Sequence, residues 1–193
     1  GVHTFMSAFN SINGVPATSN RWLLTELLRK EWKFKGFVVS DWNAVQELKA
    51  HGVAETDEDA AMAAFNAGVD MNMTDGLYNR CLEKLVREKN IDMNEIDASV
   101  ERILRAKYAL GLFEDPYRFL DNQRESREVR SASAMALARK AAASSMVLLK
   151  NANALLPLSK QTKRIALVGP LANNRAEVMG SWKARGEDKD VVT

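Results

Sequence analysis

The sequence predicts an α/β protein in which short buried strands alternate with amphipathic helices. Three apolar, β-rich segments lie at residues 2–9, 37–39 and 69–73, and a helical pattern follows each of them. Short connections between such elements are typical of parallel βα units. The segments are apolar on both faces, so the predicted sheet needs a covering layer on each side.

The first strand leads through a loop into an amphipathic helix. Asn13-Gly14 and Pro16 mark the loop. Apolar residues then recur at the spacing that one helical face requires: Trp22, Leu23, Leu24, Leu27, Leu28 and Trp32. Ser19 or Asn20 is placed to cap the first turn of this helix.

A second unit repeats the alternation after the strand at 37–39. Thr56 and Asp59 have the spacing of a capping box, with Asp where Glu is usual. The Ala-rich helix that they begin is expected to run to about Ala67, where Gly68 ends it. The segment VDMNM is then the third predicted strand.

Two further helices complete the first part of the chain. One is predicted at 77–88, and Asp92 and Glu95 are placed to cap the other, which Gly111 ends. The apolar side chains of the last helix share one face: Ile96, Val100, Ile103, Leu104 and Tyr108. Three strands cannot close a barrel, so we expect this part to be the last third of a barrel or of an open sheet.

The pattern changes after residue 113. Residues 114–127 are polar, contain Pro116 and show no periodicity, as expected of a linker. Beyond them, 128–144 is predicted as a helix, and MVLLK and RIALVGP are predicted as parallel strands. This is the expected beginning of a second α/β domain, and both ends of the sequence look like cuts through a longer protein.

Charge and hydropathy argue against several classes of partner. The 27 basic and 25 acidic residues are interspersed and leave a net charge of +2, which predicts no binding to nucleic acid or to an anionic membrane. No apolar run reaches membrane-spanning length. A small neutral or sugar-like ligand is easier to accommodate.

Three other kinds of site are poorly supported by the residues. His3 and His51 are far apart and have no cysteine partner, so no metal site is expected. Cys81 has leucines on its helical face and is interpreted as a buried apolar residue. Only Gly169 follows the strand-like run IALV, so a nucleotide-binding protein remains a weak alternative.

Asp41 is the strongest candidate for a catalytic residue. The run GFVVSDW places Asp41 and Trp42 directly after an apolar strand, and α/β folds carry their sites at the carboxyl ends of parallel strands. A carboxylate can attack the anomeric carbon of a sugar, and an aromatic ring can pack against the pyranose. The alternative is a strand-end Asp that caps a helix at 43–49, and spacing alone leaves both interpretations open.

Several segments occur together in the order and spacing of one enzyme family. MSAFNSINGVPA, GFVVSDW, GVDMNM, LGLFEDPY, SSMVLLKN, LLPL and IALVGP resemble glycoside hydrolase family 3. The resemblance covers the whole chain and implies a (β/α)8-like (TIM) barrel, a linker and an α/β sandwich domain. It implies that residues 1–113 are the last βα units of the barrel, 114–127 the linker and 128–193 the start of the sandwich.

The resemblance also implies roles for individual residues. Asp41 corresponds to the catalytic nucleophile, and Trp42, Met6 and Phe9 correspond to residues that line the glucose subsite. Many members have Tyr in place of Phe9, and the absence of that hydroxyl removes one polar contact near the nucleophile. The acid/base glutamate of the family is expected outside this chain, because the available carboxylates lie too early to match it: Glu177 and Glu187.

The implied function is that of a retaining exo-acting β-glucosidase. It would hydrolyse terminal non-reducing β-D-glucosyl residues of β-linked oligosaccharides or aryl glucosides by a two-carboxylate double displacement, with no metal or organic cofactor. A periplasmic or secreted location follows from the resemblance. We expect the isolated chain to have little activity, because half of the implied site lies outside it.

Other functions remain as alternatives. A β-xylosidase or another exo-glycosidase of the family would share Asp41. An N-acetylglucosaminidase is less consistent, because Trp42 stands where that branch has a second acidic residue. A non-catalytic carbohydrate-binding protein would keep Trp42 without needing Asp41, so the intact Ser-Asp-Trp sequence counts against it.

Overall fold

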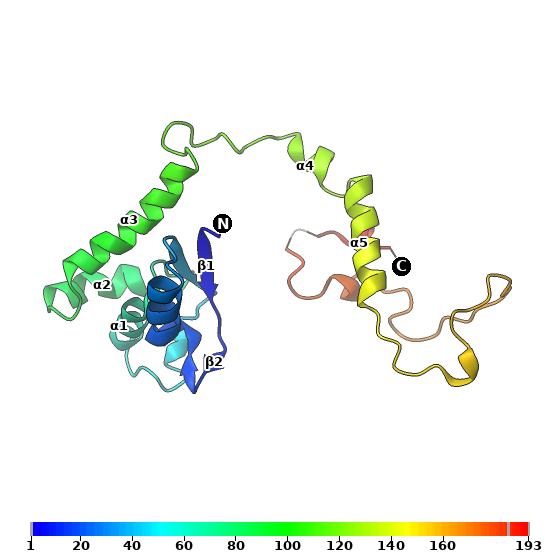
Figure 1. Cartoon of the computed structure of the whole chain (residues 1–193), viewed down its shortest axis with the longest axis horizontal. Coiled ribbons are helices and arrows are strands. Elements are labelled where there is room, and N and C mark those ends of the chain that lie inside the picture. Colours follow the sequence, from blue (N-terminus) through cyan, green and yellow to red (C-terminus); the bar gives the residue numbers. More distant parts are fainter. Residues whose placement is uncertain (1, 185, 193) are drawn as a thin grey trace. The chain divides into compact units, whose positions relative to one another are not determined.

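Two parallel strands, β1 (Thr4–Ser7) and β4 (Phe37–Ser40), form a sheet in the first part of the chain, in which β1 lies beside the N-terminus (Figure 1). The computed structural model describes residues 2–184 and 186–192. It divides the chain into two compact units, residues 1–122 and 123–193. Strands β1 and β4 pair in register from Thr4 beside Phe37 to Ser7 beside Ser40, as the alternating pattern predicts.

The third predicted strand, VDMNM, forms only a single parallel bridge to β4, between Val39 and Met71. The Ser40 N–H donates to the Met71 carbonyl at 2.8 Å, and the Asp70 N–H donates to the Val38 carbonyl at 2.8 Å. The Met73 N–H donates to the Ser40 hydroxyl and not to a backbone carbonyl of β4, so the ladder stops there. Strand β4 therefore lies between β1 and the 69–71 segment.

The predicted loop after β1 is a small hairpin. Strands β2 (Ser11–Ile12) and β3 (Val15–Pro16) pair antiparallel across Asn13 and Gly14. Both loop residues have positive φ, 54° and 80°, as a tight two-residue turn of the I′ kind requires. The short 3₁₀ helix η1 (Ala17–Ser19) follows.

The first predicted helix is present as η2 (Trp22–Glu31), but it is wound as a π-helix. Asn20 caps it, because its Oδ1 accepts the Leu23 N–H at 3.0 Å. Leu24 and Leu28 are buried, as predicted. Both tryptophans of the predicted apolar face are exposed instead, because they stand at the two ends of η2, beyond its buried middle: Trp22 and Trp32.

The core of the first unit lies between β4 and the helices that follow it. These are η3 (Gln46–Leu48), α1 (Asp57–Ala67) and α2 (Leu77–Arg87). The fully buried apolar side chains include Val38, Val45, Leu48, Val69 and Leu77. Helix α1 ends as predicted at Gly68, whose φ of 115° is unfavourable for other residues.

The predicted capping box of α1 is confirmed. The Thr56 hydroxyl accepts the Asp59 N–H at 3.1 Å, and Asp59 Oδ2 accepts the Thr56 N–H at 3.0 Å. These bonds satisfy two backbone donors that the helix cannot pair internally. The Thr56 hydroxyl also donates to Asp59 Oδ2 at 2.7 Å. This contact, and after it the bond from the Thr56 N–H, lowers the pKa of the Asp59 carboxyl.

Replacing Thr56 by alanine is expected to cost about 1 kcal/mol of the stability of α1. Amide exchange in residues 57–60 should then be roughly fivefold faster at neutral pH, since 1.4 kcal/mol corresponds to a factor of ten. Because the folded-state pKa of Asp59 is lowered, the box stabilises above the unfolded pKa and the difference should shrink as the pH falls. Thr56→Ser keeps the hydroxyl and should exchange like the wild type; equal exchange in Thr56→Ala would contradict the prediction.

The last helix of this unit is α3 (Met93–Ala109). Asp92 caps it by accepting the Asn94 N–H at 2.9 Å, and Gly111 follows its end with φ of 67°. Its predicted apolar face is only partly covered, because Val100, Leu104 and Tyr108 are exposed. Ser99 is the one buried residue among the described residues of α3.

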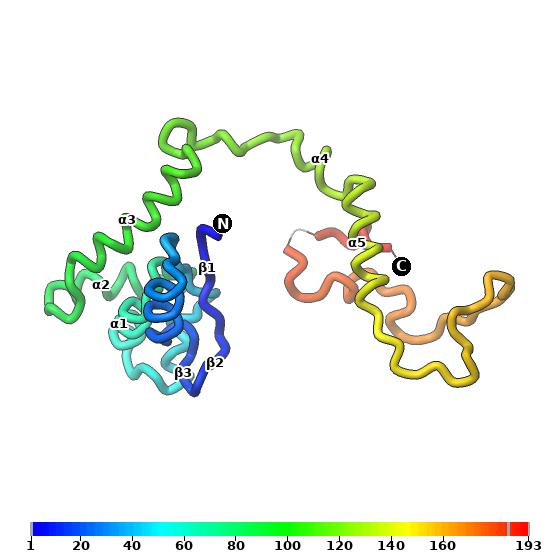
Figure 2. The backbone as a smooth tube through the Cα atoms, viewed as in Figure 1, coloured from blue at the N-terminus to red at the C-terminus, as the bar shows by residue number. Residues whose placement is uncertain are grey.

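The second unit contains mostly helical and irregular chain. Its elements are α4 (Arg124–Glu128), α5 (Ala132–Ser145), η4 (Ala152–Ala154), η5 (Glu177–Met179) and η6 (Asp188–Asp190). Figure 2 shows the chain after α5 as an irregular path. Helix α4 lies at the end of the predicted linker, and α5 begins four residues later than the helix predicted from 128.

The strands predicted at MVLLK and RIALVGP are not formed in the described part of the second unit. A strand needs a neighbouring strand to satisfy its backbone donors and acceptors, and these segments are extended without one. Their apolar side chains remain exposed, to 91% for Leu149 and 87% for Val168. The (β/α)8-like barrel also stays a prediction, since the described strands form two-stranded sheets.

Candidate active site

The predicted site residues lie at one edge of the central sheet. Because β1 and β4 are parallel and pair Ser7 with Ser40, their carboxyl ends lie side by side. Asp41 directly follows β4, and Phe9 lies just beyond the end of β1. Met6 is paired with Val39 near the same edge. The fold thus brings the ends of two sequence segments, MSAFN and SDW, to one place.

Asp41 is half-buried, and its neighbour Trp42 is exposed to 54%. Asp41 Oδ1 accepts the Trp42 N–H at 2.6 Å. The segment that follows is a turn and the 3₁₀ helix η3, which has no side-chain cap and whose N-cap position is Val45. The interpretation of Asp41 as a helix cap is therefore not supported, and the carboxylate is held by its own neighbouring amide instead.

A set of hydrogen bonds, which we call the strand-end clasp, joins Ser40 and Asn43 to Met73 and Thr74. The Met73 N–H donates to Ser40 Oγ at 2.8 Å, and the Asn43 N–H donates to the Met73 carbonyl at 3.3 Å. Thr74 Oγ1 donates to Asn43 Oδ1 at 2.8 Å. The clasp fixes the chain on either side of Asp41 to the neighbouring 71–74 segment.

Two residues of the clasp have left-handed backbone conformations. Asn43 has φ of 57° and Thr74 has φ of 68°. Asn tolerates this region, but a β-branched residue such as Thr rarely adopts it. Strain of this kind persists only where surrounding contacts hold it, and it gathers at functional sites. The bonds of the clasp hold Asn43 and Thr74 in these conformations.

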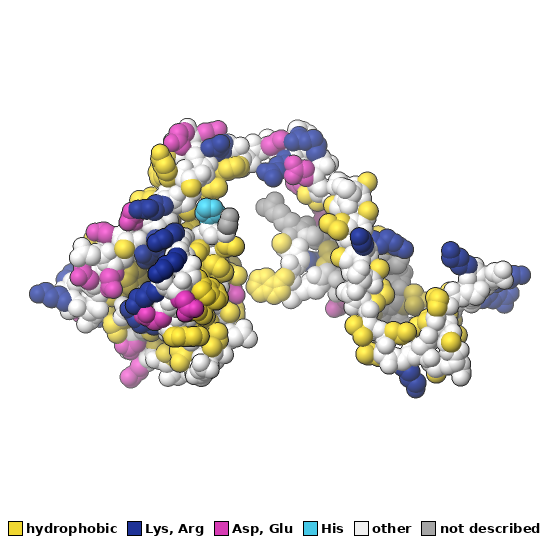
Figure 3. Space-filling model, viewed as in Figure 1, with side chains coloured by type: hydrophobic (Ala, Val, Ile, Leu, Met, Phe, Trp, Pro, Cys, Tyr) yellow, Lys and Arg dark blue, Asp and Glu magenta, His cyan; other side chains and the backbone are white. Residues whose placement is uncertain are grey.

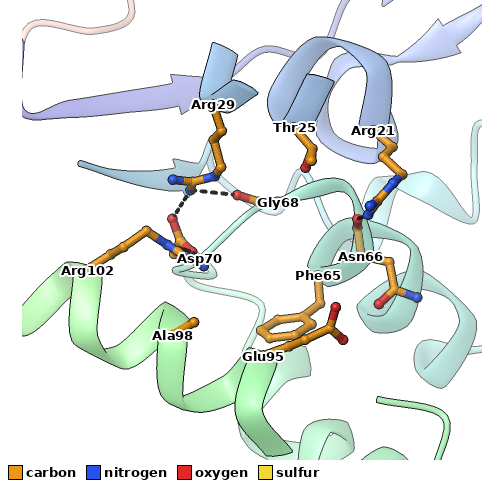
Figure 4. A pocket seen from close by; sticks show the side chains of 10 residues that line it. All are labelled: Arg21, Thr25, Arg29, Phe65, Asn66, Gly68, Asp70, Glu95, Ala98 and Arg102. Carbon is orange, nitrogen blue, oxygen red and sulfur yellow. Dashed lines mark hydrogen bonds and ion pairs between the residues drawn. The ribbon is translucent and has the colours of Figure 1, made fainter. Parts of the chain in front are cut away.

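The structure also contains a buried ionic cluster that sequence reasoning missed (Figure 4). Asp70 is 7% exposed and bonds to Arg29, to Arg102 Nε at 2.8 Å and Nη2 at 2.7 Å, and to the Val38 N–H at 2.8 Å. Arg29 also donates to the Gly68 carbonyl at 3.1 Å. Burial lowers the pKa of Arg29, an effect that Asp70 opposes and Arg102 reinforces.

The pocket in Figure 4 surrounds this cluster and is separate from the predicted site. Its charged groups from η2, the 68–70 segment and α3 are directed at one another, which is the arrangement of a structural ion cluster. The sequence offered one signal, an acidic residue inside the apolar segment VDMNM. Its arginine partners are 41 and 32 residues away, so no local pattern could reveal them.

The remaining candidate sites have plain structural explanations. Cys81 is buried in the core, where desolvation raises the pKa of its thiol. Within residues 2–184 and 186–192, no group of three or more His, Cys, Asp or Glu side chains is placed to hold a metal ion.

The helices within that described part include none with the length and apolar character of a membrane span. Lys and Arg side chains gather over part of the visible face of the first unit, mixed with acidic ones (Figure 3).

The fold and the site define a class: an α/β protein with a carboxylate and an exposed indole at the carboxyl end of a parallel strand. Sequence comparison is more specific. Residues 1–106 match the glycosyl hydrolase family 3 N terminal domain, and residues 146–193 match the glycosyl hydrolase family 3 C-terminal domain. The chain belongs to glycosyl hydrolase family 3, as the sequence motifs predicted.

Individual relatives agree with this assignment. The chain is 46% identical to the periplasmic beta-glucosidase of Salmonella typhimurium, over 100% of this chain and 26% of that protein. It is 40% identical to a putative beta-xylosidase of Formosa agariphila, over 90% of this chain and 23% of that protein. The chain thus spans about a quarter of the length of these relatives.

Solved structures give the same result. The crystal structure of beta-glucosidase from Listeria innocua in complex with glucose matches with a TM-score of 0.82 and 43% identity. The match covers 97% of this chain and 25% of the Listeria chain. The described α/β fragment is therefore similar in fold to the corresponding part of that enzyme.

Proposed function

We propose that this chain is part of a retaining, exo-acting β-glucosidase that removes terminal non-reducing β-D-glucosyl residues. The observation that carries the proposal is the placement of Asp41, a half-buried carboxylate beside the exposed Trp42 at the end of β4. Support comes from the Salmonella relative, named a periplasmic beta-glucosidase, and from Listeria structures in complex with glucose, isofagomine and laminaribiose. The relative's name also supports a periplasmic location.

The proposed reaction has two displacement steps. Asp41 attacks the anomeric carbon while an acid from outside this chain protonates the leaving oxygen, and a covalent glycosyl ester forms on Asp41. Water, activated by the same acid acting as a base, then releases the sugar and restores the carboxylate. The two carboxyl groups of a retaining enzyme lie about 5 to 5.5 Å apart. No metal ion or organic cofactor takes part in the proposed steps.

Three side chains near Asp41 are proposed to bind the glucose. Trp42 offers an exposed indole face to the apolar side of the ring, and Met6 and Phe9 also have exposed side chains, from the end of β1 and just after it. In the larger protein, we propose that residues 1–113 complete a (β/α)8-like barrel. Residues 114–127 would link it to a sandwich domain that begins at 128.

A β-xylosidase is the second candidate. The observation that favours it is the 40% identity to the Formosa protein named a putative beta-xylosidase. Xylose lacks the hydroxymethyl group of glucose, and the discrimination of one small group in a pocket is worth only about 1 to 3 kcal/mol. The two activities would share Asp41, so substrate comparison has to separate them.

Covalent trapping tests the proposal in the full-length parent protein. A 2-deoxy-2-fluoro-β-glucoside with a good leaving group slows both steps, the second more, so that the glycosyl enzyme should accumulate with a one-to-one loss of activity. Peptide mass spectrometry is expected to place the adduct on Asp41. The xylose analogue serves as the comparison, and faster labelling by it would favour the β-xylosidase. A label on another carboxylate would refute the role of Asp41.

A further inference from the structure

We propose that the Ser40 hydroxyl positions the Asp41 carboxylate through the peptide unit between Asp41 and Trp42. This inference rests on the proposed function, in which Asp41 is the nucleophile. Ser40 does not reach the substrate in this proposal, so it is a positioning residue. Three successive hydrogen bonds lead from Met73, outside β4, to Asp41 Oδ1.

The first two of these hydrogen bonds hold the carbonyl oxygen of the peptide unit between Asp41 and Trp42. The Met73 N–H donates to Ser40 Oγ at 2.8 Å, and the Ser40 hydroxyl donates to the Asp41 carbonyl oxygen at 3.0 Å. Because the hydroxyl accepts one bond and donates the other, its proton has a defined direction. Ser40 is fully buried, so its hydroxyl depends on these two contacts for its hydrogen bonds.

The third hydrogen bond holds the Asp41 carboxylate. The N–H of the same peptide unit, that of Trp42, donates to Asp41 Oδ1 at 2.6 Å. A peptide unit is planar, so fixing its carbonyl oxygen also fixes the direction of its N–H. A hydrogen bond to the carbonyl further polarises the peptide and strengthens the N–H as a donor. Ser40 therefore controls where one carboxylate oxygen is held.

The rest of the strand-end clasp prevents the peptide unit from turning as a whole. Asn43 bonds to Met73 through its backbone and to Thr74 through its side chain. The chain is thus anchored directly before Asp41 by Ser40 and two residues after it by Asn43. An attacking oxygen needs alignment with the anomeric carbon, and a misplacement of about 1 Å can cost roughly 100-fold in rate.

Ser7 provides a matched control for this role. It is the register partner of Ser40 on β1 and is also buried. Its hydroxyl is hydrogen-bonded to Thr18 Oγ1 at 2.9 Å, away from Asp41. Ser7→Ala and Ser40→Ala therefore remove the same atom from the same level of the sheet, and each removes a hydrogen bond of a buried hydroxyl.

The test compares Ser40→Ala, Ser40→Thr and Ser7→Ala in the full-length parent protein, with an aryl β-glucoside as substrate. Ser40→Ala is expected to lower kcat roughly 10- to 100-fold and to change KM by less than about threefold, since substrate binding is not its task. Ser40→Thr keeps a hydroxyl and should recover most of kcat. Ser7→Ala should lower the melting temperature as Ser40→Ala does but retain kcat.

Two results would overturn the inference while leaving the proposed function intact. One is an unchanged kcat in Ser40→Ala, and the other is an equal loss of kcat in all three variants, which would indicate a general structural role. Both require a wild-type protein that cleaves the glucoside and is labelled on Asp41. A wild type that neither cleaves nor labels would instead refute the proposed function, and this inference with it.

Discussion

Asp41→Ala in the full-length parent protein is expected to lose glycoside turnover by about 1,000-fold or more. The nucleophile forms the covalent intermediate, so its removal leaves only binding and the acid to lower the barrier. The side chain is half-buried and caps no helix, so the variant should fold with nearly unchanged stability. The measurement is kcat on an aryl β-glucoside, with the melting temperature as the check on folding.

Chemical rescue makes this prediction specific for a nucleophile. Sodium azide can occupy the space of the missing carboxylate and attack the anomeric carbon from the same side. The expected product is the α-glucosyl azide, which has the inverted configuration because a single displacement takes place. Activity should rise with azide concentration in Asp41→Ala and stay constant in the wild type. A substituted protein that keeps its turnover without azide would rule out Asp41 as the nucleophile.

Asp75→Ala is the control carboxylate. Asp75 also follows a segment that pairs with β4, but its oxygens accept the Gln46 N–H and the Leu77 N–H, both at 3.1 Å. Its role is therefore structural, and its loss should lower stability modestly while azide has no effect on turnover. If Asp75→Ala were the variant that azide rescues, the assignment would move to that residue.

Asp70→Asn is expected to cause the largest loss of stability. Breaking a buried ion cluster by removing one charge typically costs about 3 to 5 kcal/mol, because the partners remain buried without compensation. Here Arg29 and Arg102 would face each other across a neutral amide, and the amide cannot accept all the bonds that Asp70 accepts now.

Amide exchange followed by mass spectrometry measures this effect locally. Peptides that cover residues 37–40 should exchange on the order of 150- to 5,000-fold faster in Asp70→Asn, since Val38 loses its bond to the carboxylate. Asp92→Asn is the matched control, because Asn caps a helix as well as Asp does and should leave exchange unchanged. Wild-type exchange in Asp70→Asn would show that the cluster does not stabilise the sheet.

The helices and their ends were predictable because their signals are local. The capping box at Thr56 and Asp59, the cap at Asp92 and the stop at Gly68 all lie within a few residues of the backbone groups they satisfy. The strands were less predictable, since a strand exists only with a partner. The pair β1 and β4 formed as expected, whereas RIALVGP has the composition of a strand but no neighbour among the described residues.

The site was predictable to the same extent. The position of Asp41 after a strand could be predicted from the run that precedes it, and its role as nucleophile stays a prediction. The parallel register explains why MSAFN lies beside it. The contacts that hold Asp41 could not be recognised. Met73 reaches Ser40 across 33 positions of sequence, and Asp70 reaches its arginines across 32 and 41. Long-range polar contacts leave no periodic trace in the sequence.

The ion cluster around Asp70 and the strand-end clasp contact opposite ends of β4. Asp70 accepts the Val38 N–H of β4, and the strand-end clasp begins at Ser40, two residues later. We therefore expect that thermal stability and sugar specificity can be changed separately. Random libraries confined to the loops after β1 and β4 can vary the sugar that is accepted without touching the arginines that keep the strand in place. Substitutions that are meant to raise thermal stability should instead be made at the Val38 end of β4, around Arg29 and Arg102.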